Sequence, residues 1–133
     1  MTAPAPLTPS VVVLDDEPIA RALLRRFLTK YGYRPVEAAT AGEALAALRR
    51  GPVDAVILDV RLPETLTGLD VLRMLRREAP LATVPVIILT GAVLSDEEER
   101  EVTRERGFLF AKPESLDVLI KFLDQLLGRD QPQ

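Results

Sequence analysis

The chain has 133 residues, of which 47% are hydrophobic, and this is enough to build one domain with a core covered on both sides. Its formal net charge of -3, from 17 basic and 20 acidic residues, argues against direct binding to nucleic acid or to anionic lipid. Cysteine and histidine are both absent, which excludes disulfides, thiolate metal sites and catalytic sites that use histidine as the base.

The N-terminal stretch MTAPAPLTPS contains three prolines and predicts a loose lead-in over 1–10, before a single domain over 11–127 and a short tail over 128–133. It lacks the charged start and the apolar run of a secretory signal, and no apolar run approaches the length of a membrane span. We therefore expect a cytoplasmic domain with no membrane contact.

Five short apolar runs alternate with helical patterns along this domain. The predicted strands cover 11–14, 35–38, 53–58, 86–89 and 108–111. The predicted helices cover 18–31, 41–50, 69–78, 96–106 and 115–127. Two of these helices begin with a capping box, Thr40 with Glu43 and Ser95 with Glu98. Alternating strands and helices with short connections predict an α/β fold, with a mostly parallel sheet covered by helices on both faces.

Ligands of such sheets bind beyond the carboxyl ends of the strands, so the residues at those ends are the candidate site. The second strand ends in alanines, which predicts an edge strand away from the site. The other strands end, in chain order, at Asp15 and Asp16, at Asp59, at Thr90 and at Lys112.

Three carboxylates brought into one crevice repel one another unless a cation lies between them. Oxygen ligands without histidine or cysteine favour magnesium as that cation. Thr90 offers a hydroxyl for a phosphoryl oxygen, and Lys112 offers a charge that balances a phosphate. Asp59, at the end of the buried run AVILD, is the candidate nucleophile, because a carboxylate can carry a phosphoryl group as an acyl phosphate.

These residues, in the order DD, D, T and KP, resemble the receiver domain of two-component response regulators across 11–127. The resemblance is to single-domain members of the kind that act as chemotaxis regulators. It implies a flavodoxin-like, doubly wound sheet of five parallel strands in the order 2-1-3-4-5, with five helices.

The resemblance also implies a role for each candidate residue. Asp59 would accept a phosphoryl group from the phosphohistidine of a sensor histidine kinase or phosphotransfer protein. Thr90 would be the switch hydroxyl and Lys112 the ion-pair partner of the phosphate. The Mg²⁺ ligands would be Asp15, through water, with Asp16, Asp59 and the backbone carbonyl of Arg61. The chain would then be a phosphoacceptor with Mg²⁺-dependent self-phosphorylation and autodephosphorylation chemistry, and not an enzyme acting on a separate substrate.

Other interpretations remain beside this one. The Asp15-Asp16 pair alone could simply cap the following helix. A receiver-like interaction module that works without phosphorylation would have no need for the full carboxylate, threonine and lysine set. A hydrolase of the haloacid dehalogenase type usually has a second acid two residues after its nucleophile, where this chain has Arg61.

The output of the domain is expected to be a protein contact, because no output domain follows Leu127 in the sequence. Val118 and Phe122 widen the apolar arc of the last helix, which predicts either packing under a loop or a homodimer or docking face shared by 96–106, 108–111 and 115–127. Val102 is the only apolar residue of the fourth helix, so this helix is expected to shift or fray on activation.

Two positions depart from the family pattern. Leu109 stands where many members have a switch aromatic, and Phe110 is expected to face the core. Gly68 follows Pro63 by five residues, which makes this loop one residue longer than is usual.

Overall fold

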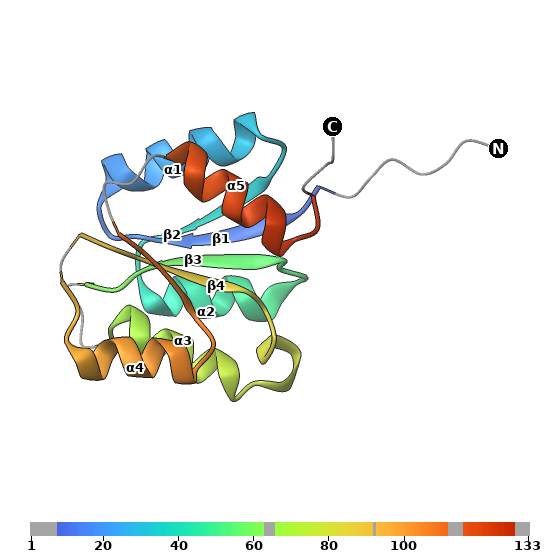
Figure 1. Cartoon of the computed structure of the whole chain (residues 1–133). Helices are drawn as coiled ribbons and strands as arrows, with labels where there is room; N and C mark the ends of the chain where they lie inside the picture. Colours follow the sequence, from blue (N-terminus) through green and yellow to red (C-terminus); the bar gives the residue numbers. More distant parts are fainter. Residues whose placement is uncertain (1–7, 63–65, 92, 112–115, 130–133) are drawn as a thin grey trace.

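A parallel sheet of five strands forms the centre of the molecule, in the order β2-β1-β3-β4-β5 (Figure 1). The computed structural model describes residues 8–62, 66–91, 93–111 and 116–129. The strands are β1 (Ser10–Leu14), β2 (Arg34–Ala38), β3 (Ala55–Asp59), β4 (Val86–Thr90) and β5 (Phe108–Ala111). Each neighbouring pair runs parallel. The predicted strand order is confirmed, including the edge position of β2.

Five helices cover the two faces of the sheet, as predicted. They are α1 (Pro18–Lys30), α2 (Ala41–Arg50), α3 (Gly68–Arg76), α4 (Asp96–Arg104) and α5 (Leu116–Leu126). Figure 1 shows α1 and α5 on one face, with α2, α3 and α4 on the other. The chain is therefore doubly wound. Within the described ranges, no helix is long and apolar enough to cross a membrane.

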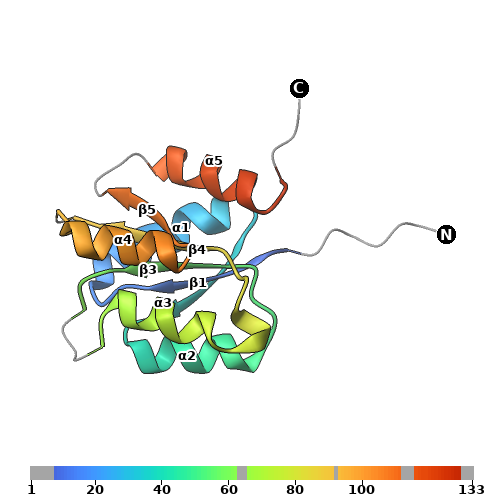
Figure 2. The same cartoon turned by 60° about the horizontal axis from the view of Figure 1, so that its bottom comes forward.

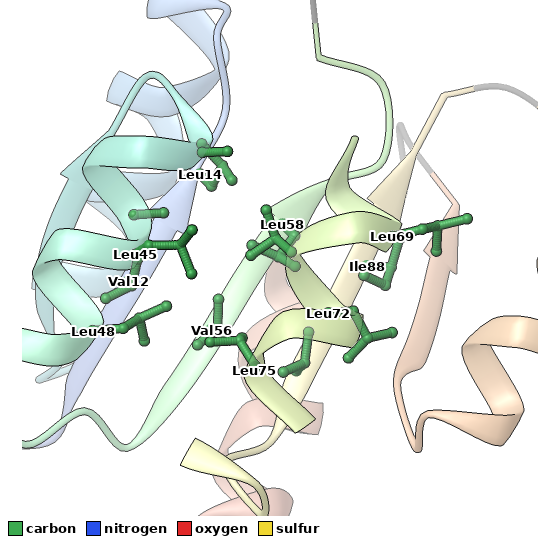
Figure 3. Packing of buried hydrophobic residues seen from close by; sticks show 14 of the residues in the cluster. Val12, Leu14, Leu45, Leu48, Val56, Leu58, Leu69, Leu72, Leu75 and Ile88 are labelled. Carbon is green, nitrogen blue, oxygen red and sulfur yellow. The ribbon is translucent and has the colours of Figure 1, made fainter. Parts of the chain in front are cut away.

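Each face of the sheet has its own apolar core, because the buried strands send alternate side chains to opposite faces. On one face Val12, Val56 and Ile88 pack against leucines of α2 and α3, as Figure 3 shows. On the other face Val13 and Ile57 pack against residues of α1 and α5. Central strands with two buried faces explain the unbroken apolar runs of the sequence.

Several helix boundaries differ from the prediction. The third helix ends at Arg76 and a short 3₁₀ turn, η1 (Ala79–Leu81), follows it, because Pro80 cannot continue a helix through 78. The fourth helix ends at Arg104, and the left-handed residue after it is Arg106, at φ 60°. Gly107 lies one residue further on, where a Cβ would be 3.1 Å from side-chain atoms of Leu72 and Val102.

The two predicted capping boxes have different outcomes. At α4 the Ser95 hydroxyl and the Glu98 carboxylate bond each other's backbone amides, so this box is confirmed. At α2 the Thr40 hydroxyl accepts from the Glu43 amide at 3.1 Å, but the Glu43 carboxylate accepts from the amide of Ala39 instead of that of Thr40. The α2 box is therefore only half formed.

Candidate magnesium and phosphoryl site

Three carboxylates meet at the carboxyl ends of β1 and β3. Asp15 and Asp16 directly follow β1, and Asp59 is the last residue of β3, which lies beside β1 in the sheet. One carboxylate oxygen from each residue lies within 4.8 Å of the others. Asp15 is buried, Asp59 is half-buried and Asp16 is exposed. The cluster is therefore anchored on its inner side and open to solvent on its outer side.

Asp15 is held at both its backbone and its side chain. Its amide donates to the Ala38 carbonyl at 3.1 Å, which extends the β1–β2 ladder by one bond. Its Oδ1 accepts from the Glu17 amide at 2.9 Å, and its carbonyl accepts from the Arg21 guanidinium at 2.6 Å. The buried carboxylate thus has a fixed orientation toward Asp16 and Asp59.

The N-cap of α1 is Glu17, which the sequence analysis did not predict. Its carboxylate accepts from the amides of Ile19 and Ala20, at 3.2 and 3.4 Å. Pro18 occupies the first turn, as predicted. Because Glu17 caps the helix, the interpretation of Asp15 and Asp16 as the capping residues is wrong.

The start of α3 lies close to the backbone of Asp59 and Val60. Oδ1 of Asp59 accepts from the Arg61 amide at 3.1 Å, and the Gly68 amide donates to the Val60 carbonyl at 3.2 Å. A Cβ at Gly68 would lie 2.3 Å from the carbonyl oxygen of Asp59, which is too close for any side chain. The start of α3 therefore packs directly on the backbone of the candidate acceptor, and only glycine allows this approach.

The remaining predicted site residues lie at the next two strand ends. Thr90 is the last residue of β4 and is buried, one position beyond the residue that pairs with Asp59. Lys112 follows β5 but lies outside the described residues, so its predicted role stays a prediction. Arg61 stands two residues after Asp59 in the chain. This position suits the predicted role of its backbone carbonyl as a Mg²⁺ ligand.

The side chain of Arg61 makes a contact that sequence reasoning missed. Its guanidinium pairs with the Glu98 carboxylate of α4 at 3.2 Å. The Ser95 amide donates to Glu98, and together with Arg61 it holds the pKa of this carboxyl below its ordinary value. The loop that follows the candidate acceptor is therefore joined by charge to the first turn of α4.

The donor chemistry of the cluster fits magnesium. All three converging groups are carboxylates, the hard oxygen ligands that Mg²⁺ prefers, and the exposed side leaves space for waters and a phosphate. Asp15, Asp16 and Asp59 are the side chains that would hold it.

Comparison with known proteins identifies relatives over nearly the whole chain. The family described as "Response regulator receiver domain" matches residues 11–124. The polar-differentiation response regulator DivK of Brucella ovis is 30% identical over 124 residues, which covers 92% of this chain and 98% of DivK. The probable transcriptional regulatory protein TcrX of Mycobacterium tuberculosis is 35% identical over 120 residues, covering 90% of this chain. The chain spans only 50% of the length of TcrX.

Solved structures agree with this result. The chemotaxis protein CheY4 of Vibrio cholerae superimposes with a TM-score of 0.83 at 27% identity, covering 91% of this chain and all of CheY4. The receiver domain of the Francisella response regulator 1452 superimposes with a TM-score of 0.81 at 27% identity, covering 93% of this chain and all of that domain.

Proposed function

Because the chain belongs to the response regulator receiver family of two-component signalling, we propose that it is a phosphorylation-dependent switch in which Asp59 accepts the phosphoryl group. The observation that carries the proposal is the convergence of Asp15, Asp16 and Asp59 at adjoining strand ends. Family membership implies a histidine kinase, or a phosphotransfer protein, as the donor. We propose that the exchange takes place in the cytoplasm.

In the proposed transfer, a carboxylate oxygen of Asp59 attacks the phosphorus of a phosphohistidine. The new oxygen–phosphorus bond forms as the phosphorus–nitrogen bond breaks, and the donor's imidazole nitrogen leaves with the electron pair and takes up a proton. Bound Mg²⁺ would neutralise charge on the phosphoryl oxygens, with Asp15, Asp16, Asp59 and the Arg61 carbonyl as the groups that hold it. Hydrolysis by water returns Asp59 to its free form.

Thr90 and Lys112 would read the new state of Asp59. The buried position of Thr90 at the end of β4 suits a hydroxyl that donates to a phosphoryl oxygen. Lys112 would pair with the phosphoryl charge. Both roles are proposals. They are supported by the positions of Thr90 at the end of β4 and of Lys112 directly after β5 in the sequence.

Phosphorylation would change the output face through Arg61. The modification adds about 1.5 to 2 negative charges at Asp59, two residues before Arg61, and we propose that the Arg61 guanidinium then gains a second acidic partner besides Glu98. Loss of the Arg61–Glu98 pair would loosen the first turn of α4. We propose that α4 shifts in this way and that its movement reaches a protein target on the face of α4, β5 and α5.

The output face carries the apolar residues that the proposal needs. Leu109 and Val118 are exposed by 41% and 48%. Phe122 is less available than the sequence suggests, since its ring packs against those of Phe108 and Phe110, with centroids 5.2 and 5.1 Å apart. Val118 is therefore the better probe of a target or homodimer contact at this face.

Intact-mass measurement after incubation with a small phosphodonor tests the proposal. We expect one phosphate adduct on the wild type that requires Mg²⁺, is absent from Asp59→Asn, and persists in the matched control Asp96→Asn on the exposed start of α4. An adduct on Asp59→Asn would place the acceptor elsewhere. No adduct on folded wild type with Mg²⁺ would favour the receiver-like module that works without phosphorylation.

The output face has its own test. Sedimentation of Val118→Ser, with and without the phosphodonor, should show weaker self-association than the wild type if the face forms a homodimer. If the sedimentation of Val118→Ser equals that of the wild type, the face does not form a homodimer. A downstream protein would then be the proposed partner of this face.

A further inference from the structure

Arg21 on α1 is hydrogen-bonded to the backbone of the carboxylate cluster at the end of β1. Its guanidinium donates to the Asp15 carbonyl at 2.6 Å, a short distance for a charge-assisted hydrogen bond. The same guanidinium contacts Glu37 of β2 at 3.3 Å. Arg21 therefore bridges the acidic turn and the neighbouring edge strand.

The Asp15 carbonyl needs a donor from outside the sheet. The last ladder bond between β1 and β2 is the one from the Asp15 amide to Ala38, so the carbonyl lies beyond the end of the ladder. Asp15 is only 1% exposed, and a buried carbonyl is costly to leave without a partner. Arg21 supplies that partner from one turn into α1.

This contact acts on the peptide that joins the two acids. The Asp15 carbonyl belongs to the Asp15–Asp16 peptide plane, so fixing that oxygen fixes the direction in which the chain enters Asp16. Asp16 is exposed, and the contacts described above anchor Asp15 rather than Asp16. The orientation of the exposed carboxylate therefore depends on the peptide that Arg21 holds.

Glu37 balances the positive charge of Arg21 near the proposed cation site. A free guanidinium near the carboxylates would repel a divalent ion, but Glu37 neutralises Arg21 on its other side. Arg25 also pairs with Glu37, at 3.7 Å, and has no contact with Asp15 among the described hydrogen bonds. Arg21 and Arg25 thus both pair with Glu37, but only Arg21 has a described hydrogen bond to Asp15.

We infer that Arg21 is a positioning residue for divalent-cation binding, which holds the Asp15–Asp16 peptide so that both carboxylates face the ion. The inference rests on the magnesium site of the proposed function. Groups that orient metal ligands from outside typically change metal affinity by about tenfold or more when they are removed. Arg21 would act through Asp15 and Asp16, since its described contacts are to the Asp15 carbonyl and to Glu37.

Titration with Mn²⁺, followed by the electron paramagnetic resonance signal of the free ion, measures this effect without any phosphorylation. Mn²⁺ takes the same hard oxygen ligands as Mg²⁺. We expect Arg21→Met to weaken Mn²⁺ binding by about tenfold. Arg25→Met, the matched loss of one positive charge beside Glu37, should bind as tightly as the wild type. Urea unfolding of each variant confirms that the dissociation constant refers to folded protein.

Arg21→Lys separates a hydrogen-bond donor from a merely structural side chain. A lysine can donate to the Asp15 carbonyl but lacks the fork that also engages Glu37, so binding should recover to between the wild type and Arg21→Met. Equal affinity of Arg21→Met and wild type, an equal loss in Arg25→Met, or no recovery in Arg21→Lys would each overturn the inference. Absence of Mn²⁺ binding by the wild type would instead overturn the magnesium site itself.

Discussion

Helices α4 and α5 flank the same edge of the sheet from opposite faces, and they are attached to it by different forces (Figure 2). Helix α5 buries Leu119, Ile120 and Leu123 against β1, β3 and β4, whereas α4 buries Val102 alone. Apolar packing depends on surface removed from water, so it is indifferent to a charge added some distance away. Helix α5 is therefore expected to stay in place when the site is modified.

Helix α4 is attached mainly by charge. The acidic side chains at 98, 101 and 105 pair with arginines of α3, of its C-cap and of the loop after β3: Glu98 with Arg61, Glu101 with Arg73, and Glu105, just beyond α4, with Arg77. The acids at 98, 101 and 105 are spaced to lie on one side of the helix. Pairs this close to solvent contribute little stability each, but they respond to new charge and to salt. The contrast teaches that the helix proposed to respond is the one with the weaker apolar attachment.

The largest expected difference between the two helices is in the cost of truncating a buried side chain. Leu123→Ala in α5 should lower the free energy of unfolding by about 3 kcal/mol, because it leaves a cavity in a closed core. Val102→Ala in α4 removes fewer atoms and should cost about 2 kcal/mol. Urea denaturation measures both. Equal costs would mean that α4 is attached as firmly as α5.

Alkaline pH tests the polar contact of the α5 side. Tyr33 donates to Asp124 of α5, and Arg129 stacks on its ring at 4.3 Å. Burial, followed by the bond to Asp124, raises the pKa of Tyr33 from 10.0 to about 12. The unfolded chain loses this proton first, so the stabilisation is complete below pH 10 and falls by about 2 kcal/mol as pH rises through 12. In Tyr33→Phe, unfolding measured over this range should show a flatter dependence on pH.

Amide hydrogen exchange compares the two helices in the native state. Amides of α4 should exchange about tenfold faster than those of α5, since opening α4 exposes little apolar surface. Added NaCl should widen the gap, because it screens the arginine–carboxylate pairs of α4 and leaves α5 unaffected. Protection of α4 equal to that of α3, at low and high salt alike, would contradict the expected mobility of α4.

The smallest effect concerns the first turn of α4. Glu98→Gln should lower stability by about 0.5 kcal/mol at neutral pH through loss of the Arg61 pair, while Glu99→Gln, an exposed neighbour with no described ion pair, serves as the control. Because the pKa of Glu98 is held below its ordinary 4.5, its contribution is present above that pH and disappears as pH falls through the lowered value. Glu98→Gln should therefore be less sensitive to acid than the wild type in urea unfolding.

The sheet and the cluster were predictable because both follow from short-range rules. Apolar runs with two buried faces identify central strands, and parallel strands align their carboxyl ends, which brings Asp15, Asp16 and Asp59 together. That clustering is confirmed. The roles of Thr90 and Lys112 stay predictions.

The missed features depend on contacts between distant residues or on unusual capping residues. Thr67 and Asp70 form a complete capping box at α3, but the recognised pattern has glutamate or glutamine at the second position. The partners of Arg21 and Arg61 depend on which strand or helix lies opposite, and a long side chain gives no local signal of that. Apolar periodicity likewise left open whether Phe122 packs internally or forms a docking face, and its ring lies against two aromatic rings of β5.

The close approach of Gly68 to Asp59 fixes one point of the connection between β3 and α3. Since the Gly68 amide is bonded to Val60 and a Cβ would collide with the Asp59 carbonyl, the chain must return to this point with glycine, whatever its path before it. A saturation library at position 68 should therefore yield folded protein only with glycine. Glycine at the first residue of α3 is then a condition of the fold.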